Sequence, residues 1–230
     1  MLNRKSAILV KFAYVVIMLP FLIFVLGWIK WYYSIPMAVI LLFCFFRMCK
    51  EAPELWVPDL NKENLLKILF IIGIILLWVY FSGIGKFVFQ NHDHFERNAI
   101  FNVLVEYKWP VINTQIIPDI SAVENTFSNT SRTSLMYYIG YWLPSAVVGK
   151  LLGIRIGYYA QAAWGALLII LVYYFICTRF KKILIWPLVV MIFFSGLDIV
   201  GHYLTGTDLH TLDSSMHLEW CPVYPCPPSP

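Results

Sequence analysis

Long apolar stretches alternate with short polar ones along this chain, and their lengths predict membrane-spanning helices. A helix needs about 20 apolar residues to cross a hydrocarbon core about 30 Å thick. Several stretches approach that length, and the predicted spans are residues 12–29, 31–46, 65–85, 157–177 and 183–200. The sequence therefore predicts an all-α, polytopic transmembrane protein with about five spans.

Composition supports the membrane interpretation and excludes a nucleic-acid partner. Hydrophobic residues make up 60% of the chain and charged residues only 13%, whereas soluble domains carry about 25% charged residues. The net charge of +4 is spread over short segments, and no basic patch is interleaved with stacking aromatics. Membrane lipids are therefore the expected surroundings, and the positive charges indicate topology.

Lysine and arginine residues predict which ends of the spans face the cytoplasm. Arg4 and Lys5 precede the first span, and further cations surround the polar loop 47–64. Cytoplasmic loops carry an excess of such residues. We therefore expect a protein of the cell membrane with its N-terminus and the loop 47–64 in the cytoplasm.

The apolar segment 135–153 is long enough to pose a choice of topology. If both this segment and 157–177 crossed the membrane, Arg179, Lys181 and Lys182 would face outward, against the positive-inside bias. If only 157–177 crosses, these cations join the others inside. The segment 135–153 is therefore predicted to be interfacial or re-entrant.

The predicted spans divide the chain into four regions, as follows. Residues 1–85 form three transmembrane helices, 86–156 an extracytoplasmic loop with interfacial helices, 157–200 two transmembrane helices, and 201–230 an extracytoplasmic tail. An odd number of spans followed by a Pro- and Cys-rich tail leads us to expect the N-terminal portion of a longer protein.

The densest polar cluster, residues 90–98, directly follows the third predicted span. Apolar residues spaced for one helix face come next: Ile100, Val103, Leu104 and Tyr107. Their spacing predicts an amphipathic helix that begins near Asp93. Asp93 and Glu96 also fit a capping box, and Asp93 and Arg97 fit an i, i+4 ion pair. His92 and His94 flank Asp93, but neighbours in sequence rarely converge on one metal, so no metal site is predicted there.

A second polar group lies at the outer end of the last predicted span. Asp198 and His202 are spaced i, i+4 and therefore share one helix face. An ionisable residue inside a membrane costs free energy unless it faces protein or water, which favours a role in substrate binding. The alternative is that Asp198 simply lies at headgroup depth.

Several motifs in this order resemble the first extracytoplasmic loop of the GT-C glycosyltransferases. They are an acidic residue just outside a span, an interfacial helix, the pair Trp109-Pro110, the segment LMYYIGYWLPSAVVGKLLG at 135–153, and a span ending in basic residues. The likeness covers about residues 65–182 and is greatest to the protein O-mannosyltransferase and aminoarabinose-transferase branch. Those enzymes transfer a sugar from a polyprenyl-phosphate carrier to an acceptor outside the cytoplasmic membrane.

This resemblance implies roles for the polar cluster. Asp93 matches the acidic residue that activates the acceptor or helps to bind a metal, although the second acid that often follows in the family is missing here. Arg97 or Lys86 is expected at the phosphate of the lipid-linked sugar donor, and Glu96 at the substrate. The involvement of a divalent cation stays open.

The alternative function is a non-enzymatic polytopic protein, either a transporter fragment or an assembly partner. A transporter should carry paired polar residues near the middle of the membrane. The first four predicted spans contain almost none, which favours the enzyme.

Overall fold

The structure of the chain is a computed structural model that describes residues 5–88, 90, 92–111, 135 and 138–193, with the backbone alone at 92 and 93. It divides into two units, Met1–Lys182 and Ile183–Pro230, and each is described by itself.

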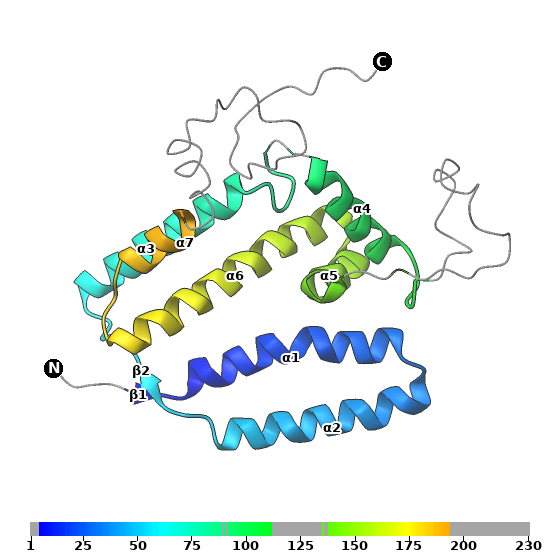
Figure 1. Ribbon diagram of the computed structural model, residues 1–230, viewed down its shortest axis with the longest axis horizontal. Coiled ribbons are helices and arrows are strands. Elements are labelled where there is room, and N and C mark those ends of the chain that lie inside the picture. Colours follow the sequence, from blue (N-terminus) through cyan, green and yellow to red (C-terminus); the bar gives the residue numbers. More distant parts are fainter. Residues whose placement is uncertain (1–4, 89, 91, 112–134, 136–137, 194–230) are drawn as a thin grey trace, which may run out of the picture. The chain divides into compact units, whose positions relative to one another are not determined.

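The described part of the chain is mostly helical, as predicted (Figure 1). The helices of the first unit are α1 (Ile8–Trp28), α2 (Trp31–Lys50), α3 (Lys62–Phe81), α4 (His92–Glu106), α5 (Leu143–Leu152) and α6 (Ile154–Phe180), with the short 3-10 helix η3 (Ile139–Tyr141) before α5. The second unit contains α7 (Trp186–Phe193).

Two short strands, β1 (Lys5–Ser6) and β2 (Leu55–Trp56), form an antiparallel pair that the sequence analysis missed. A strand of two residues is too short to show the period-2 alternation by which strands are recognised in a sequence. The pair joins the segment before α1 to the loop between α2 and α3.

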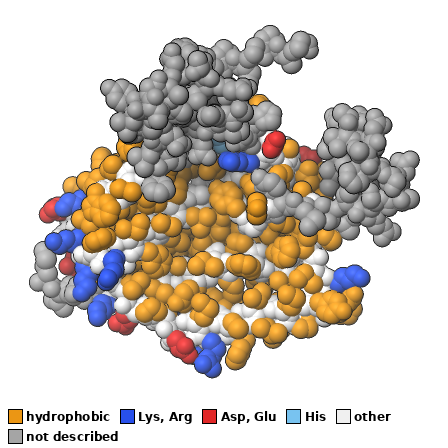
Figure 2. All heavy atoms as spheres, in the orientation of Figure 1, with side chains coloured by type: hydrophobic (Ala, Val, Ile, Leu, Met, Phe, Trp, Pro, Cys, Tyr) orange, Lys and Arg blue, Asp and Glu red, His pale blue; other side chains and the backbone are white. Residues whose placement is uncertain are grey.

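Among the described residues, α1, α2, α3 and α6 are long and apolar enough to cross a membrane. Their outward-facing side chains form apolar surfaces larger than soluble proteins expose to water. For example, Ile17 on α1 is 61% exposed and Phe43 on α2 is 64% exposed. Figure 2 shows hydrophobic side chains over the face formed by α1 and α2. The protein is therefore embedded in a membrane.

The third predicted span is shifted relative to α3, and local chemistry explains both ends. The side chain of Asn61 accepts a hydrogen bond from the backbone N–H of Asn64 at 2.8 Å, so the helix starts before the apolar run begins. Gly83 follows the helix with φ at +82°, a left-handed conformation that a right-handed helix cannot include.

The fifth predicted span is described only in part. α7 covers Trp186–Phe193, whereas residues 194–200 and the predicted tail 201–230 lie outside the described residues.

The spanning helices of the first unit run between two ends. β1 directly precedes α1, β2 lies between α2 and α3, and the Tyr174 hydroxyl of α6 donates to the Trp56 carbonyl at 2.8 Å. The start of α1, the end of α2, the start of α3 and the end of α6 therefore lie together, and we call this region the strand end (Figure 1). Opposite it, Trp28 of α1 contacts Trp109 after α4, with ring centroids 4.8 Å apart. We call that region the α4 end.

The segment 135–153 forms two short helices at the α4 end. α5 has ten residues, and a helix of that length extends about 15 Å, half the thickness of a hydrocarbon core. Pro144 stands in its first turn, where the missing N–H costs nothing, and Gly153 ends it with φ at +95°. α5 packs against α1, α4 and α6.

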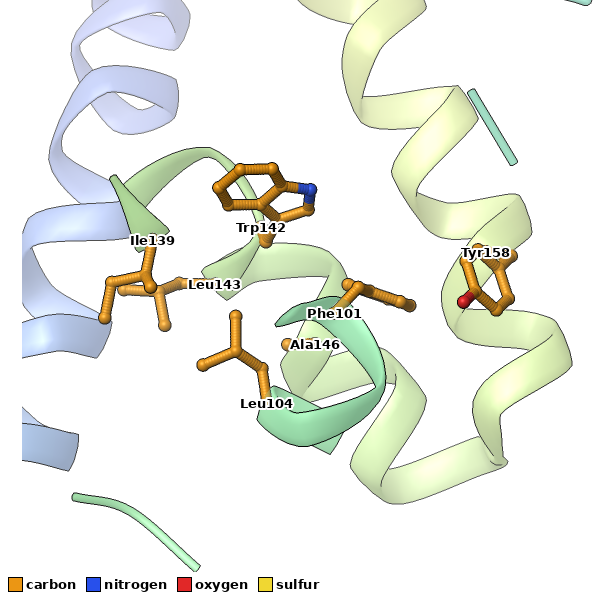
Figure 3. Close-up of a cluster of buried hydrophobic side chains, with 7 residues drawn as sticks. All are labelled: Phe101, Leu104, Ile139, Trp142, Leu143, Ala146 and Tyr158. Carbon is orange, nitrogen blue, oxygen red and sulfur yellow. The ribbon is translucent and has the colours of Figure 1, made fainter. Parts of the chain in front are cut away.

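A buried hydrophobic cluster joins α4, α5, η3 and α6 (Figure 3). Its members are Phe101, Leu104, Ile139, Trp142, Leu143, Ala146 and Tyr158. The sequence predicted that Ile100, Val103, Leu104 and Tyr107 form the apolar face of α4. In the structure Leu104 and Phe101 are fully buried, whereas the other three predicted residues are only half-buried. The apolar face is thus rotated toward Phe101, which packs against Tyr158 of α6 and lies in one cluster with Leu143 and Ala146 of α5.

Candidate functional site

The turn between α3 and α4 is shaped by glycines at two close contacts. A Cβ atom at Gly83 would lie 2.6 Å from Nε2 of His94 on α4. A Cβ atom at Gly85 would lie 3.1 Å from the Cβ atom of Ala162 on α6. Both glycines have positive φ, at +82° and +89°, a conformation that costs them little. The turn therefore lies directly on both helices.

Lys86 continues this turn in the left-handed conformation, with φ at +60°. Non-glycine residues rarely adopt it, and such positions concentrate at binding sites. The Nζ atom lies 4.6 Å from the centroid of the Tyr158 ring, within the range of a cation–π interaction. The residue is exposed, so the ring holds an ammonium group that remains accessible to a ligand.

Amide and hydroxyl groups connect the turn, α4 and α6. Gln90 Nε2 donates to the Gly83 carbonyl at 2.8 Å, and Asn98 Nδ2 donates to Gln90 Oε1 at 2.6 Å. The Tyr158 hydroxyl donates to Asn102 Oδ1 at 2.7 Å. These bonds fix α4 to the turn through Asn98 and to α6 through Asn102, so the turn that carries Lys86 and α4 are held in place together.

Lys150 of α5 holds the other end of α4. Its Nζ atom donates to the carbonyl of Val105 at 3.2 Å and to the carbonyl of Tyr107, and lies 5.0 Å from the Trp109 ring centroid. The last carbonyls of a helix lack partners within the helix, and a cation at a helix C-terminus is favourable. Partial burial lowers the pKa of Lys150 through desolvation.

The structure places some of the predicted site residues and not others. Asp93 lies in the first turn of α4, which begins at His92, but its side chain is outside the description. Glu96 and Arg97 are exposed on the same helix. The contact between Gly83 and His94 brings the first turns of α4 to the turn that carries Lys86. Asp198 and His202 lie outside the described residues.

Among the described side chains, no group of three His, Cys, Asp or Glu residues could hold a metal ion.

Four polar residues of this region escaped the sequence analysis: Asn102, Tyr141, Tyr158 and Gln161. Asn102 and Tyr141 are surrounded by apolar residues in the sequence, and only the packing of α4 and η3 against α6 brings them to the site. Gln161 had a usable signal, because a lone amide within an apolar span is costly unless it has a function or a partner.

Comparison of this chain with models of protein families, with curated proteins and with solved structures found no match.

Proposed function

We propose that the chain is part of a membrane glycosyltransferase that takes a sugar from a polyprenyl-phosphate carrier. One observation carries the proposal: the Lys86 ammonium is held on the Tyr158 ring, accessible, and next to the first turns of α4. A cation held in place at a membrane boundary suits a lipid phosphate. Its side chain is already ordered by the ring, so binding does not have to meet the entropic cost of ordering it.

The proposed orientation puts the α4 end outside the cytoplasmic membrane. Most described cations that flank the spans lie at the strand end: Lys5, Arg47, Lys50, Lys62, Lys67, Arg179, Lys181 and Lys182. The positive-inside rule assigns that end to the cytoplasm. α5 is too short to span, which supports an interfacial or re-entrant role for 135–153.

The length of α6 also agrees with a site at the membrane boundary. Its 27 residues extend about 40 Å, some 10 Å more than the hydrocarbon core. Helix ends beyond the core reach the headgroup layer, where lipid phosphates lie. Tyr158 stands near the start of α6, which supports a position of Lys86 close to such a phosphate.

The proposed chemistry is direct transfer to an acceptor hydroxyl. The Asp93 carboxylate removes the hydroxyl proton as the acceptor oxygen bonds to the anomeric carbon of the sugar. The bond between that carbon and the phosphate oxygen breaks, and the polyprenyl phosphate leaves with the bonding electrons. Lys86 stabilises the charge that develops on the leaving phosphate. Arg97, Glu96, Asp198 and His202 are further candidates for substrate contacts.

Lipid binding to the purified chain in nanodiscs tests the proposal. The probes are radiolabelled polyprenyl phosphates that carry mannose or aminoarabinose. Lys86→Met keeps the apolar stem but removes the charge, and we expect it to weaken binding about tenfold or more. Lys86→Arg should restore most of the affinity, and Lys108→Met, an exposed matched control, should change little. Unchanged binding by Lys86→Met would reject the phosphate contact.

The role of Asp93 requires a separate readout. Asp93→Asn preserves size, so it should leave donor binding unchanged while it lowers the rate at which sugar leaves the lipid carrier. Equal sugar release by the variant and the unaltered chain would reject the role of Asp93. No release from the unaltered chain would favour the alternative of a non-enzymatic transporter fragment or assembly partner.

A further inference from the structure

Two buried polar atoms near the proposed phosphate contact have no hydrogen-bond partner among the described residues. They are the hydroxyl oxygen of Tyr141 on η3 and Oε1 of Gln161 on α6. Gln161 is only 7% exposed. An unsatisfied buried polar group costs about 1–3 kcal/mol, so each calls for a specific explanation. Burial of the Tyr141 hydroxyl also raises its pKa to about 12, which keeps it a neutral donor.

The Tyr141 hydroxyl of η3 lies beside the part of α6 that carries Gln161. A Cβ atom at Gly165 would lie 2.9 Å from the Tyr141 hydroxyl oxygen and 3.9 Å from Cδ1 of Ile84. Gly165 follows Gln161 by one helical turn and therefore shares its face. The absence of a side chain at Gly165 is what leaves room for the Tyr141 hydroxyl beside that face.

This region adjoins the turn that carries Lys86. Ile84 lies close to Gly165, as the distance above shows, and a Cβ atom at Gly85 would lie 3.1 Å from the Cβ atom of Ala162 on α6. Tyr158, on which the Lys86 ammonium rests, precedes Gln161 by three positions and lies on a neighbouring part of the same helix surface. Gln161 is thus about one helical turn from the ring that holds the cation, and the Tyr141 hydroxyl lies one further turn along α6.

The chemistry of the two atoms indicates the kind of ligand group that they suit. A tyrosine hydroxyl can donate a hydrogen bond, whereas Gln161 Oε1 can only accept one. A phosphate dianion cannot satisfy Gln161 Oε1, because it has no proton to donate. A sugar hydroxyl both accepts and donates, so hydroxyl groups of a ligand can satisfy both atoms at once.

We infer that Tyr141 and Gln161 bind hydroxyl groups of the sugar on the lipid donor, beside the phosphate contact at Lys86. This inference rests on the proposed function and adds residues that select the glycosylated lipid over the bare carrier. A site built to hydrogen-bond a hydroxyl discriminates strongly against a ligand that lacks it, because its own polar groups are then left unpaired.

The test compares polyprenyl phosphate with and without its sugar, mannose or aminoarabinose, on the chain in nanodiscs. Gln161→Met and Tyr141→Phe remove the hydrogen-bonding atoms and keep most of the volume. Each should weaken binding of the glycosylated lipids about tenfold and change binding of bare polyprenyl phosphate less than about twofold. Tyr138→Phe is the matched control, because Tyr138 is exposed, and should bind both lipids as the unaltered chain does.

The outcomes separate the two hypotheses. Suppose that Lys86→Met weakens binding of both lipids. If Gln161→Met and Tyr141→Phe then leave the binding of both lipids unchanged, or weaken the binding of the two lipids equally, the sugar contact is wrong and the phosphate contact stands. If the unaltered chain binds neither lipid saturably, the proposed function fails and this inference fails with it. Retained thermal stability of both variants shows that any lost affinity is not a folding defect.

Discussion

At the α4 end, two lysine ammonium groups lie over aromatic rings. Lys86 lies over Tyr158 and Lys150 over Trp109, at 4.6 Å and 5.0 Å from the ring centroids. The Lys150 ammonium also donates hydrogen bonds to backbone carbonyls, whereas the Lys86 ammonium has no hydrogen-bond acceptor among the described residues. The first cation therefore suits a ligand, and the second serves to position α4.

Removal of the Lys150 ammonium should destabilise the chain through the end of α4. Lys150→Met leaves the Val105 and Tyr107 carbonyls without this donor, and we expect a loss of about 1–2 kcal/mol. Thermal unfolding in detergent measures it, with Lys108→Met as the control. Equal melting temperatures for the two variants would show that the carbonyls find water instead.

Ionisation of Tyr141 should make stability depend on pH in the alkaline range. The folded chain holds the pKa of this hydroxyl at about 12, above its ordinary value of 10. Between these values the unfolded chain loses the proton and the folded chain keeps it, so stability is fully present below pH 10 and falls as pH rises toward 12. Tyr141→Phe lacks this dependence.

The measurement is the melting temperature of the unaltered chain and of Tyr141→Phe at pH 9 and pH 11. The difference in the free energy of unfolding, variant minus unaltered chain, should be about 1 kcal/mol larger at pH 11 than at pH 9. All other ionisations cancel in this comparison. A difference that does not change with pH would mean that the hydroxyl is solvated in the folded state.

At the scale of elements, α5 and α6 approach each other through glycine. A Cβ atom at Gly157 would lie 2.9 Å from the Gly149 Cα atom and 3.1 Å from the Phe101 ring. This approach lets α4 pack over both helices and so forms the surface on which Asn102 meets Tyr158. Hydropathy predicted the helices but not this contact, because small residues weaken an apolar signal even where they permit the closest packing.

Gly157→Ala should therefore destabilise the chain by about 1–3 kcal/mol, because the new methyl group meets backbone that cannot move without separating the helices. Gly73→Ala on α3 is the matched control, since nothing lies within 4 Å of its added Cβ atom, and it should be neutral or slightly stabilising. Melting temperatures in detergent compare the two. A neutral Gly157→Ala would indicate that α5 and α6 separate without cost.

At the scale of the whole molecule, the sequence predicted the membrane helices well and the candidate site only in outline. Spans follow from local composition, so α1, α2, α3 and α6 fall near their expected positions. The site depends on contacts between distant segments, such as Lys86 with Tyr158 and Tyr141 with Gly165. The position of Lys86 after the third predicted span made it a candidate, but the sequence pattern held no information on which aromatic ring its ammonium group would contact.

The distribution of cations leads to a prediction about topology. Lys108 follows α4, and Lys182 follows α6. If α6 crosses the membrane and the segment 135–153 does not, these two residues lie on opposite sides. The positive-inside rule then puts Lys182 in the cytoplasm and Lys108 outside.

Single cysteines at these positions, in a chain whose own five cysteines are replaced, decide the matter. We expect Lys108→Cys to react with a membrane-impermeant maleimide in intact cells, and Lys182→Cys and Glu51→Cys to react only after permeabilisation. Glu51 serves as the reference because it lies at the strand end, after α2. Reaction of Lys108→Cys and Lys182→Cys from the same side would mean that 135–153 also crosses. The Lys86 site would then still face outward, but the cations after α6 would break the positive-inside pattern, and the proposed orientation would lose its main support.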